Sequence, residues 1–147
     1  VKGRLTRLTF SGGGAFVEIG YDTGDRVTSV RDSRLPVSEL GGDTYTFAYD
    51  AADRLTTVTY PTGDQVGYGY DRAGRLVGLR DPDGNWATYT YGTGAQERGL
   101  VQAHHPRVGT YDFTHDPATG RLISRTLYLN GVHVGESFSY DGQGRLN

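Results

Sequence analysis

The sequence predicts an all-β chain, and three observations carry this prediction. Residues that favour strands number 48, whereas residues that favour helices number 30. Apolar or aromatic residues alternate with small or polar ones in several stretches, which is the two-residue period of a strand. Clusters of Gly, Pro and Asp that are typical of tight turns separate these stretches. We therefore expect an antiparallel β-strip of short strands and turns.

A repeat runs through the whole chain. The string Tyr-Asp-x-x-(Gly/Asp)-Arg-(Leu/Val) starts at Tyr21, Tyr49, Tyr70 and Tyr140. A copy with one inserted residue starts at His115, and Tyr91-Gly92 marks a degenerate copy. Successive markers are separated by 28, 21, 21, 24 and 25 residues. The unit is therefore ~21 residues long with insertions in loops, and the chain holds about six units.

The first strand of each unit leads into the marker. Every second position of this strand is mostly an aromatic or branched residue, while the positions between them are small or polar. One face of the strip should therefore carry aromatic rings and the other should be lean, with each cross-strand pair contributing roughly 0.2 to 1 kcal/mol. The strands predicted in this way are Val17-Ile19-Tyr21, Tyr45-Phe47-Tyr49, Val66-Tyr68-Tyr70, Ala87-Tyr89-Tyr91, Tyr111-Phe113-His115, and Val134 with Phe138-Tyr140.

The second strand of each unit starts at Arg-Leu, as in residues 55–60. A turn follows it, in which proline presets φ and glycine accepts positive φ, as in residues 60–63 and 81–85. Each unit is therefore two strands and two turns. We expect loops where the pattern is less regular, over residues 12–14, 32–43, 92–98 and 104–109.

The polar residues of the motif are explained by the turn itself. The Asp carboxylate can accept hydrogen bonds from backbone N–H groups about two residues on, and glycine permits the reversal. Arg54, Arg75 and Arg145 can reach back to the Asp or to a neighbouring carbonyl. We predict that the motif residues are structural. They are Tyr21, Asp22, Arg26, Tyr49, Asp50, Arg54, Tyr70, Asp71, Gly74, Arg75, Asp116, Arg121, Tyr140, Asp141 and Arg145.

Composition excludes several classes of protein. The formal net charge is −2 and no block of like charge stands out, so we expect no nucleic-acid partner. The absence of cysteine excludes a disulfide framework and a thiolate site. The longest apolar run is three residues, so we expect no membrane span and no signal segment. A chain of 147 residues is long enough to bury a sizeable core.

The histidines and the acidic turn do not indicate a metal site. His104-His105 precede Pro106 in an expected loop, while His115 and His133 lie at strand positions. Residues 81–85 carry the first half of a calcium-loop spacing, but they lack the following Gly and the distal Glu. A hairpin turn explains them, so we predict no metal and no cofactor.

The sequence offers no catalytic constellation. No Ser lies in a pattern that would place it beside a His and a carboxylate, and Ser11 before the glycine triplet fits a strand connection. No helical pattern follows a glycine-rich segment, so no phosphate cradle is predicted. We therefore predict that the protein is not an enzyme. Carbohydrate binding stays open as an alternative, and it would require exposed Tyr rings or Trp86 in a shallow groove.

The array resembles the YD-repeat proteins, also called Rhs repeats, whose unit is x-Tyr-x-Tyr-Asp-x-x-Gly-Arg-Leu followed by Pro-x-Gly. Residues 68–76 and 81–85 fit this unit almost letter for letter, and the resemblance covers essentially the whole chain. The family includes bacterial Rhs toxins, shell components of insecticidal toxin complexes, wall-associated surface proteins and animal teneurins. In these proteins the repeats form a β-strip wound into a hollow shell, which encloses an effector in the toxins and supports adhesion in teneurins. The resemblance implies a curved, non-catalytic wall.

The chain departs from the family pattern in two ways, which indicate that it is part of a longer array. About six units are far fewer than a closed shell needs, and the motif at which toxin arrays are cleaved is absent. We expect residues 1–147 to form a single array cut from a longer chain. The resemblance also implies a secreted or cell-surface location. The partners it implies are neighbouring repeats of the same or identical chains, an enclosed effector domain or a surface glycan. A self-assembling extracellular filament or adhesion protein is the alternative.

Overall fold

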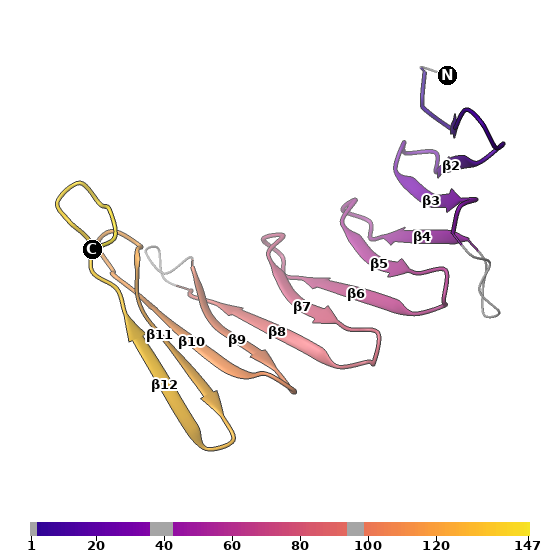
Figure 1. Cartoon of the computed structure of the whole chain (residues 1–147). Coiled ribbons are helices and arrows are strands. Elements are labelled where there is room, and N and C mark those ends of the chain that lie inside the picture. The colour runs from indigo at the N-terminus through magenta and orange to yellow at the C-terminus, as the bar shows by residue number, and fades with distance from the viewer. Residues whose placement is uncertain (1–2, 36–42, 94–98) are drawn as a thin grey trace. The chain divides into compact units, whose positions relative to one another are not determined.

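The structure, a computed structural model, describes residues 3–35, 43–93 and 99–147 (Figure 1). The strand order in the sheet is the order along the chain, and the described ranges contain no helix. The predicted all-β antiparallel class is confirmed. The strands are β1 (Arg7–Thr9), β2 (Phe16–Tyr21), β3 (Val27–Asp32), β4 (Thr44–Tyr49), β5 (Leu55–Thr59), β6 (Gln65–Tyr70), β7 (Leu76–Arg80), β8 (Trp86–Tyr91), β9 (Leu100–His105), β10 (Gly109–His115), β11 (Leu122–Leu129) and β12 (Val132–Ser137).

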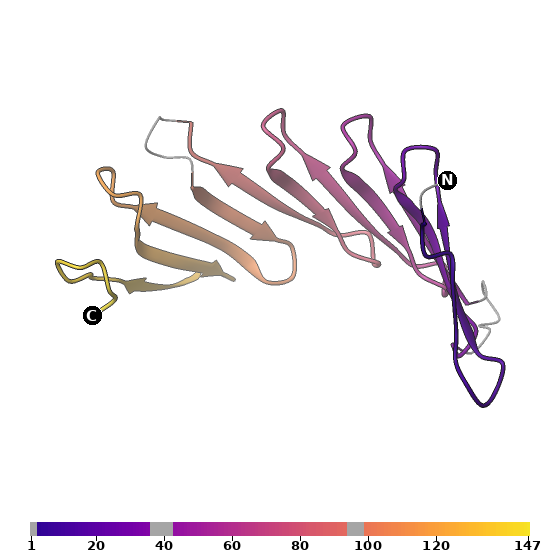
Figure 2. The ribbon, with the colours of Figure 1, turned by 90° about the horizontal axis from the view of Figure 1, so that it is seen from above.

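The chain divides into two compact units. Unit 1 comprises Val1–Gly69 with Arg80–Pro82, and unit 2 comprises Tyr70–Leu79 with Asp83–Asn147. In unit 1, β1 to β6 pair in succession, and in unit 2, β8 to β12 pair in succession, always antiparallel. Figures 1 and 2 show the connections within each unit alternating between the two ends of the strands. The single array over residues 1–147 stays a prediction.

The register of unit 1 separates a ring-bearing face from a polar face. Phe47 lies opposite Val58, and Val58 lies opposite Val66 on the next strand. The neighbouring row is polar, because Thr46 lies opposite Thr59. Successive side chains of a strand point to opposite faces, so these rows lie on opposite sides of the sheet. The two rows that the alternation predicts are present in this unit, except that Phe16 lies on the polar side, where Arg7 and Arg31 contact its ring.

Unit 2 repeats this division. Tyr89, Ala103 and Tyr111 lie opposite one another in a row across three strands. The adjacent polar row contains Thr88 and His104 directly opposite each other. Tyr89 and Tyr111 therefore share one face, whereas Tyr128, which lies opposite Thr110, and Trp86 lie on the polar face.

The prediction that the chain buries a sizeable core is wrong. Among the described residues, the only buried hydrophobic side chain is Ala87, which is 6% exposed, and no large side chain is fully buried. A sheet builds a core only when a second layer covers one face, and in Figures 1 and 2 no second layer covers either face within each unit. The apolar side chains instead pack against their neighbours along the same face, where they stay half-exposed.

A bulge lies at the end of four strands that lead into a marker turn. The register shifts by one residue between Gly20 and Tyr21, and the same shift occurs at Ala48/Tyr49, Thr90/Tyr91 and Thr114/His115. A bulge adds one residue and increases the local twist, so it redirects the marker side chain at the entrance of the turn. The repeat motif therefore includes a bulge that its letters do not display.

The predicted loops are partly confirmed and partly corrected. Residues 11–13 form a turn that overlaps the loop predicted over residues 12–14, and the N–H of Phe10 donates to the carbonyl of Ala15 over 2.9 Å. The loop predicted over residues 104–109 is too long, because β9 runs to His105 and β10 begins at Gly109. His104 pairs with a strand on each side, which extends the sheet up to Pro106. Residues 36–42 and 94–98 of the other two predicted loops lie outside the described residues.

Candidate functional site

One carboxylate closes each regular Tyr-Asp turn, as the second copy illustrates. The N–H of Asp50 donates to the carbonyl of Arg54 over 2.9 Å. Oδ1 of Asp50 accepts from the backbone N–H groups of Ala52 and Arg54 at 2.8 and 3.0 Å. Oδ2 accepts from Nε of Arg54 at 2.8 Å. The side chain therefore satisfies the donors that the reversal leaves without a backbone partner.

The same arrangement recurs in three other copies. The Nε···Oδ2 distances are 2.6 Å for Arg26 and Asp22, 2.7 Å for Arg75 and Asp71, and 2.7 Å for Arg145 and Asp141. These hydrogen bonds favour the ionised carboxylate. The arginine side chain is the main cause that lowers the pKa of Asp22 and Asp50, and the arginine backbone N–H is the main cause at Asp71 and Asp141.

The inserted residue of the fifth copy changes its turn. Oδ1 of Asp116 accepts from the backbone N–H and the hydroxyl of Thr119, at 2.7 and 2.9 Å. The backbone bond from Thr119 is the first cause that lowers the pKa of Asp116. No hydrogen bond or ion pair between the side chains of Arg121 and Asp116 is present in the described part of the chain, and Arg121 lies over the ring of Tyr140, 5.4 Å from its centroid.

Four marker tyrosines each connect a repeat to the one before it. Each hydroxyl donates to the carbonyl of the Leu or Val that follows the Arg of the preceding turn. The pairs are Tyr21 with Leu5 at 2.9 Å, and Tyr49 with Val27, Tyr91 with Leu76 and Tyr140 with Leu122, each at 2.8 Å. The residues of a pair are 15 to 22 positions apart, so the bond joins neighbouring units rather than the two ends of one turn.

The arginine of a turn also reaches the next turn, as Arg26 shows. Its Nε pairs with Asp22 in its own turn at 2.6 Å, and its Nη1 pairs with Asp53 in the following turn at 2.6 Å. The guanidinium also lies 5.0 Å from the ring centroid of Tyr49, which is within cation–π range. One planar guanidinium with several fixed donors can serve all three partners at once.

This contact between turns recurs along the chain. Arg4 lies over Tyr21 at 5.4 Å, pairs with Asp25 at 2.6 Å and donates to the carbonyl of Asp22 at 3.2 Å. Arg75 lies over Tyr91 at 4.6 Å. Each of these arginines therefore holds the tyrosine of the following repeat.

Sequence reasoning missed the role of Asp25 and Asp53. Both occupy the fifth position of the motif, where Gly74 stands in the third copy, and both have positive φ, 67° and 61°. Glycine adopts this conformation without strain, whereas other residues do so at a cost. Both carboxylates pair with the arginine of the preceding turn. The signal was present in the sequence as the Gly/Asp choice at this position.

The remaining predicted residues lie where the motif places them. Tyr70 is the last residue of β6 and Asp71 follows it, while Gly74 has a φ of 82°. Residues 81–85 form a turn with positive φ at Gly84, and Asp83 in this turn pairs with Arg107 at 2.7 Å. Across the described ranges, no group of three or more His, Asp or Glu side chains could hold a metal ion. Nowhere in the described part of the chain does a helix have the length and apolarity needed to cross a membrane.

Part of the repeat region matches a known protein family. Residues 38–65 and 49–85 match the model of the RHS Repeat family. No curated protein sequence matches the chain.

Solved structures share the fold. The crystal structure of TcdB2-TccC3-Cdc42 is similar with a TM-score of 0.68 and 17% identity, over 90% of this chain and 7% of that chain. The crystal structure of TcdB2-TccC3 is similar with a TM-score of 0.67 and 17% identity, and the match covers 90% of this chain and 8% of that chain. A structure of the Photorhabdus luminescens Tc holotoxin pore is similar with a TM-score of 0.67 and 16% identity, and the match covers 90% of this chain and 8% of that chain. The chain thus spans less than a tenth of the length of these proteins. The resemblance that the sequence indicates is confirmed, because residues 38–85 match the RHS Repeat family and the chain shares the fold of these Rhs-repeat structures.

Proposed function

We propose that this chain is a segment of the wall of an Rhs-type shell that encloses or presents a toxin effector. The repeat-to-repeat linkage carries the proposal, because Tyr49 and Arg26 bind successive turns of the strip. Such linkage can extend a sheet by any number of units, as in other repeat proteins. The similarity to the Tc holotoxin pore supports the same reading.

The proposed role is structural and non-catalytic. In this view the motif residues from Tyr21 to Arg145 stabilise the strip, and residues 1–147 act as one continuous array. The ring-bearing face and the polar face give a wall two different surfaces, and curvature of the strip would direct one of them inward. The partners are neighbouring repeats and an enclosed effector, and the location is secreted or at the cell surface, as the family resemblance implies.

A filament or adhesion protein is the second candidate, and the edge strand β12 favours it. All six residues of β12 are exposed, and Val132 and Val134 are 64% and 62% exposed. The N–H of Phe138 donates to Ile123, so by antiparallel alternation the backbone groups of Gly135 and Ser137 point away from β11. An unpaired edge of this kind is a template for another strand.

Light scattering of purified residues 1–147, with electron microscopy of the same sample, separates the two candidates. A wall segment should be monomeric, or should aggregate irregularly through its uncovered faces. Regular filaments or rings would overturn the wall proposal and support self-assembly through the edges. The distinction depends on geometry, because repeated edge pairing between identical chains gives either an ordered line or a closed ring.

A further inference from the structure

Arg121 differs from the other motif arginines in its partners. Four of them pair with a carboxylate oxygen at 2.6 or 2.7 Å, namely Arg26, Arg54, Arg75 and Arg145. Within residues 3–35, 43–93 and 99–147, the guanidinium of Arg121 donates no hydrogen bond and forms no ion pair, and it lies 5.4 Å from the ring centroid of Tyr140. Its five N–H donors are therefore available to a ligand.

The inserted residue of this copy accounts for the missing contact within the turn. Oδ1 of Asp116 accepts from the backbone N–H groups of Ala118 and Thr119 at 2.9 and 2.7 Å, and from the hydroxyl of Thr119 at 2.9 Å. The bonds from Thr119 are the main causes that lower the pKa of Asp116, and the charge of Arg121 is a lesser one. The carboxylate of this turn is thus held without the arginine.

The following turn also lacks the carboxylate that serves an earlier arginine. Arg26 pairs at 2.6 Å with Asp53, the residue at the fifth position of the next turn. The corresponding residue after Arg121 is Gly144, which has a φ of 81°. A Cβ at Gly144 would collide with the guanidinium of Arg121. The guanidinium therefore lies where it would meet an aspartate at this position, and glycine leaves that place open.

A small pocket opens beside Arg121 within unit 2. It has a volume of about 250 Å³, and its lining includes Ile123, Phe138 and Tyr140, which are half-buried. The volume lies below the roughly 300 to 1,000 Å³ of small-ligand sites. The pocket is therefore sized for one or two side chains of a partner rather than for a whole drug-sized molecule.

The carboxylate of Asp116, which also lines the pocket, does not exclude a second carboxylate. Arg26 binds Asp22 and Asp53 at 2.6 Å each. A motif arginine of this strip can therefore serve two carboxylates at once, because its planar group carries several donors.

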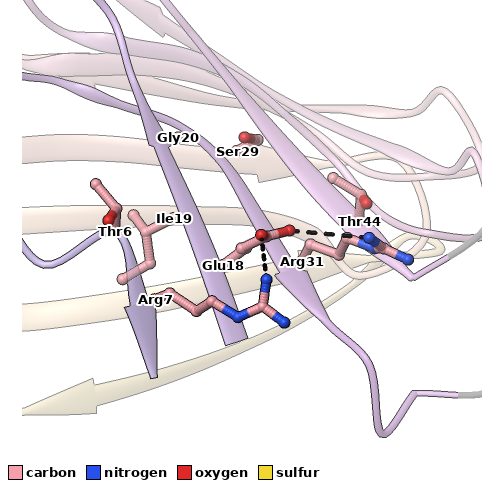
Figure 3. Close-up of a pocket in the computed structure, with 8 residues that line it drawn as sticks. All are labelled: Thr6, Arg7, Glu18, Ile19, Gly20, Ser29, Arg31 and Thr44. Atoms are coloured by element: carbon pink, nitrogen blue, oxygen red, sulfur yellow. Dashed lines mark hydrogen bonds and ion pairs between the residues drawn. The ribbon is translucent and has the colours of Figure 1, made fainter. Parts of the chain in front are cut away.

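A groove on the polar face of unit 1 offers a contrast. Arg7 and Arg31, which line it, approach the carboxylate of Glu18 from two sides, at 2.9 and 3.8 Å (Figure 3). Both guanidinium groups also lie over the ring of Phe16, 3.9 and 5.2 Å from its centroid. Their charges are directed at a carboxylate of the chain itself. At Arg121, in contrast, a carboxylate from outside would displace no hydrogen bond or ion pair of the described chain.

We propose that Arg121 binds an aspartate or glutamate side chain of a partner polypeptide. A guanidinium presents paired N–H donors in a plane that matches a carboxylate, and such charge-assisted bonds are stronger than neutral ones. Ile123 and Phe138 would contact an apolar residue next to the acidic one. The contact has the chemistry of the pair between Arg26 and Asp53, with the acidic residue supplied by another chain. This site goes beyond the wall role and does not depend on it.

The test is a titration of the whole chain with a blocked Phe-Asp-Gly peptide, followed by NMR of arginine Nε–H and backbone amide signals. We expect saturable shifts at Arg121 and at Ser139, which also lines the pocket. A blocked Phe-Asn-Gly peptide should bind about tenfold more weakly. Arg121→Gln should lose the binding and keep the fold. Arg125→Gln is the matched control, because Arg125 pairs with Glu136 at 2.7 Å outside the pocket, and it should bind as the original chain does.

Gly144→Asp is a second variant, which supplies the carboxylate from within the chain. Aspartate already occupies this position at positive φ in two earlier turns, as Asp25 and Asp53. The new carboxylate should pair with Arg121 and weaken peptide binding about tenfold. Gly142→Asp is its control, because it adds the same charge to the same turn at a position whose Cβ would meet no atom within 4 Å. Binding to this control should stay within about twofold of the original, as expected for a distant exposed charge.

Three results would overturn the proposal. The first is that the Phe-Asp-Gly peptide moves no signal at Arg121 or Ser139. The second is that Arg121→Gln, with its other amide signals unchanged, binds the peptide as tightly as the original chain. The third is that acetate alone binds the original chain as tightly as the peptide, which would assign the site to small carboxylates. None of these results bears on the assembly state that tests the wall.

Discussion

At the scale of single residues, the marker tyrosine and the motif arginine act on different repeats. The tyrosine hydroxyl reaches backward, as Tyr49 does to the carbonyl of Val27, and the arginine reaches forward, as Arg26 does to Asp53. An exposed ion pair contributes little by itself, about 0 to 1 kcal/mol. The guanidinium gains more from serving its own turn, the next turn and a ring simultaneously. The motif letters therefore encode contacts between units as well as a turn.

Removal of the Tyr49 hydroxyl tests the backward contact. Tyr49→Phe keeps the ring on its face and removes only the 2.8 Å bond to Val27, so we expect a loss of about 1 kcal/mol in the free energy of unfolding. Urea unfolding followed by circular dichroism measures this loss. Tyr128→Phe is the control, because Tyr128 is 45% exposed and its hydroxyl has no hydrogen-bond partner among the described residues. Equal stability of the two variants would argue against the contact.

Substitution of Asp53 separates backbone strain from ion pairing. Asp53→Ala and Asp53→Gly both remove the pair with Arg26, but alanine keeps a side chain at a φ of 61° whereas glycine does not. We expect the alanine variant to be less stable than the glycine variant by about 1 kcal/mol. Thermal unfolding of the two variants gives the difference. An alanine variant as stable as the glycine variant would contradict the proposed strain.

At the scale of elements, each regular turn is held together by one carboxylate, and a strand leads into it and out of it. Asp50 binds two backbone N–H groups and the Arg54 side chain, so the turn holds its shape without a core beneath it. The bulge at Ala48/Tyr49 precedes it and sets the direction of the ring. The strands between turns pair antiparallel, and rows such as Tyr89 and Tyr111 lie on the face opposite the polar rows. Because little apolar surface is buried, the turns have an unusually large share in stabilising the sheet.

The turn carboxylates predict a loss of stability in acid. The folded pKa of Asp22, Asp50, Asp71 and Asp141 is lowered by the arginine of each turn. Their contribution is therefore fully present above the unfolded pKa, about 3.9, and is lost as pH falls through the lower folded values. We expect the melting temperature to fall steeply below about pH 4. Asp50→Asn should melt lower at neutral pH and depend less on pH below 4. The same acid slope in both proteins would refute this origin.

At the scale of the whole molecule, stability should be a sum of units and of contacts between neighbours. A repeat array without a common core has this property, because each unit touches only adjacent units. The contacts of Tyr21, Tyr49, Tyr91 and Tyr140 follow this rule, since each reaches the repeat directly before it. Local opening should therefore spread from one turn to its neighbour and decrease with distance along the chain.

Hydrogen exchange of two arginine variants tests this spreading. Arg26→Ala removes contacts to two turns, so amides in residues 21–27 and in residues 49–55 should both exchange faster. Arg145 is the matched control, because its described contacts are with Asp141 and Gln143 in its own turn. Arg145→Ala should therefore speed exchange only in residues 140–146. Faster exchange confined to residues 21–27 in Arg26→Ala would show that neighbouring turns are not coupled.

Local features were predictable because their cause lies within a few residues. The period of two predicts the strands, and the Asp and Arg of one turn lie four residues apart, so the closure between Asp50 and Arg54 could be inferred from the letters. The two-faced strip also followed, since alternation fixes which side chains share a face. The loop predicted over His104 and His105 was wrong because pairing with strands on both sides extends β9.

The sequence alone determined the all-β class, the repeat length, the turns and the family resemblance. Only the tertiary structure decided which turns each arginine joins, how little of the chain is buried, and that Arg7, Glu18 and Arg31 line one groove. Arg26 and Asp53 are 27 positions apart, and their meeting depends on strand register and on a bulge. Register is a property of paired strands, and a shift of one residue reverses every face. Contacts of this range therefore follow from the assembled sheet and not from the local pattern.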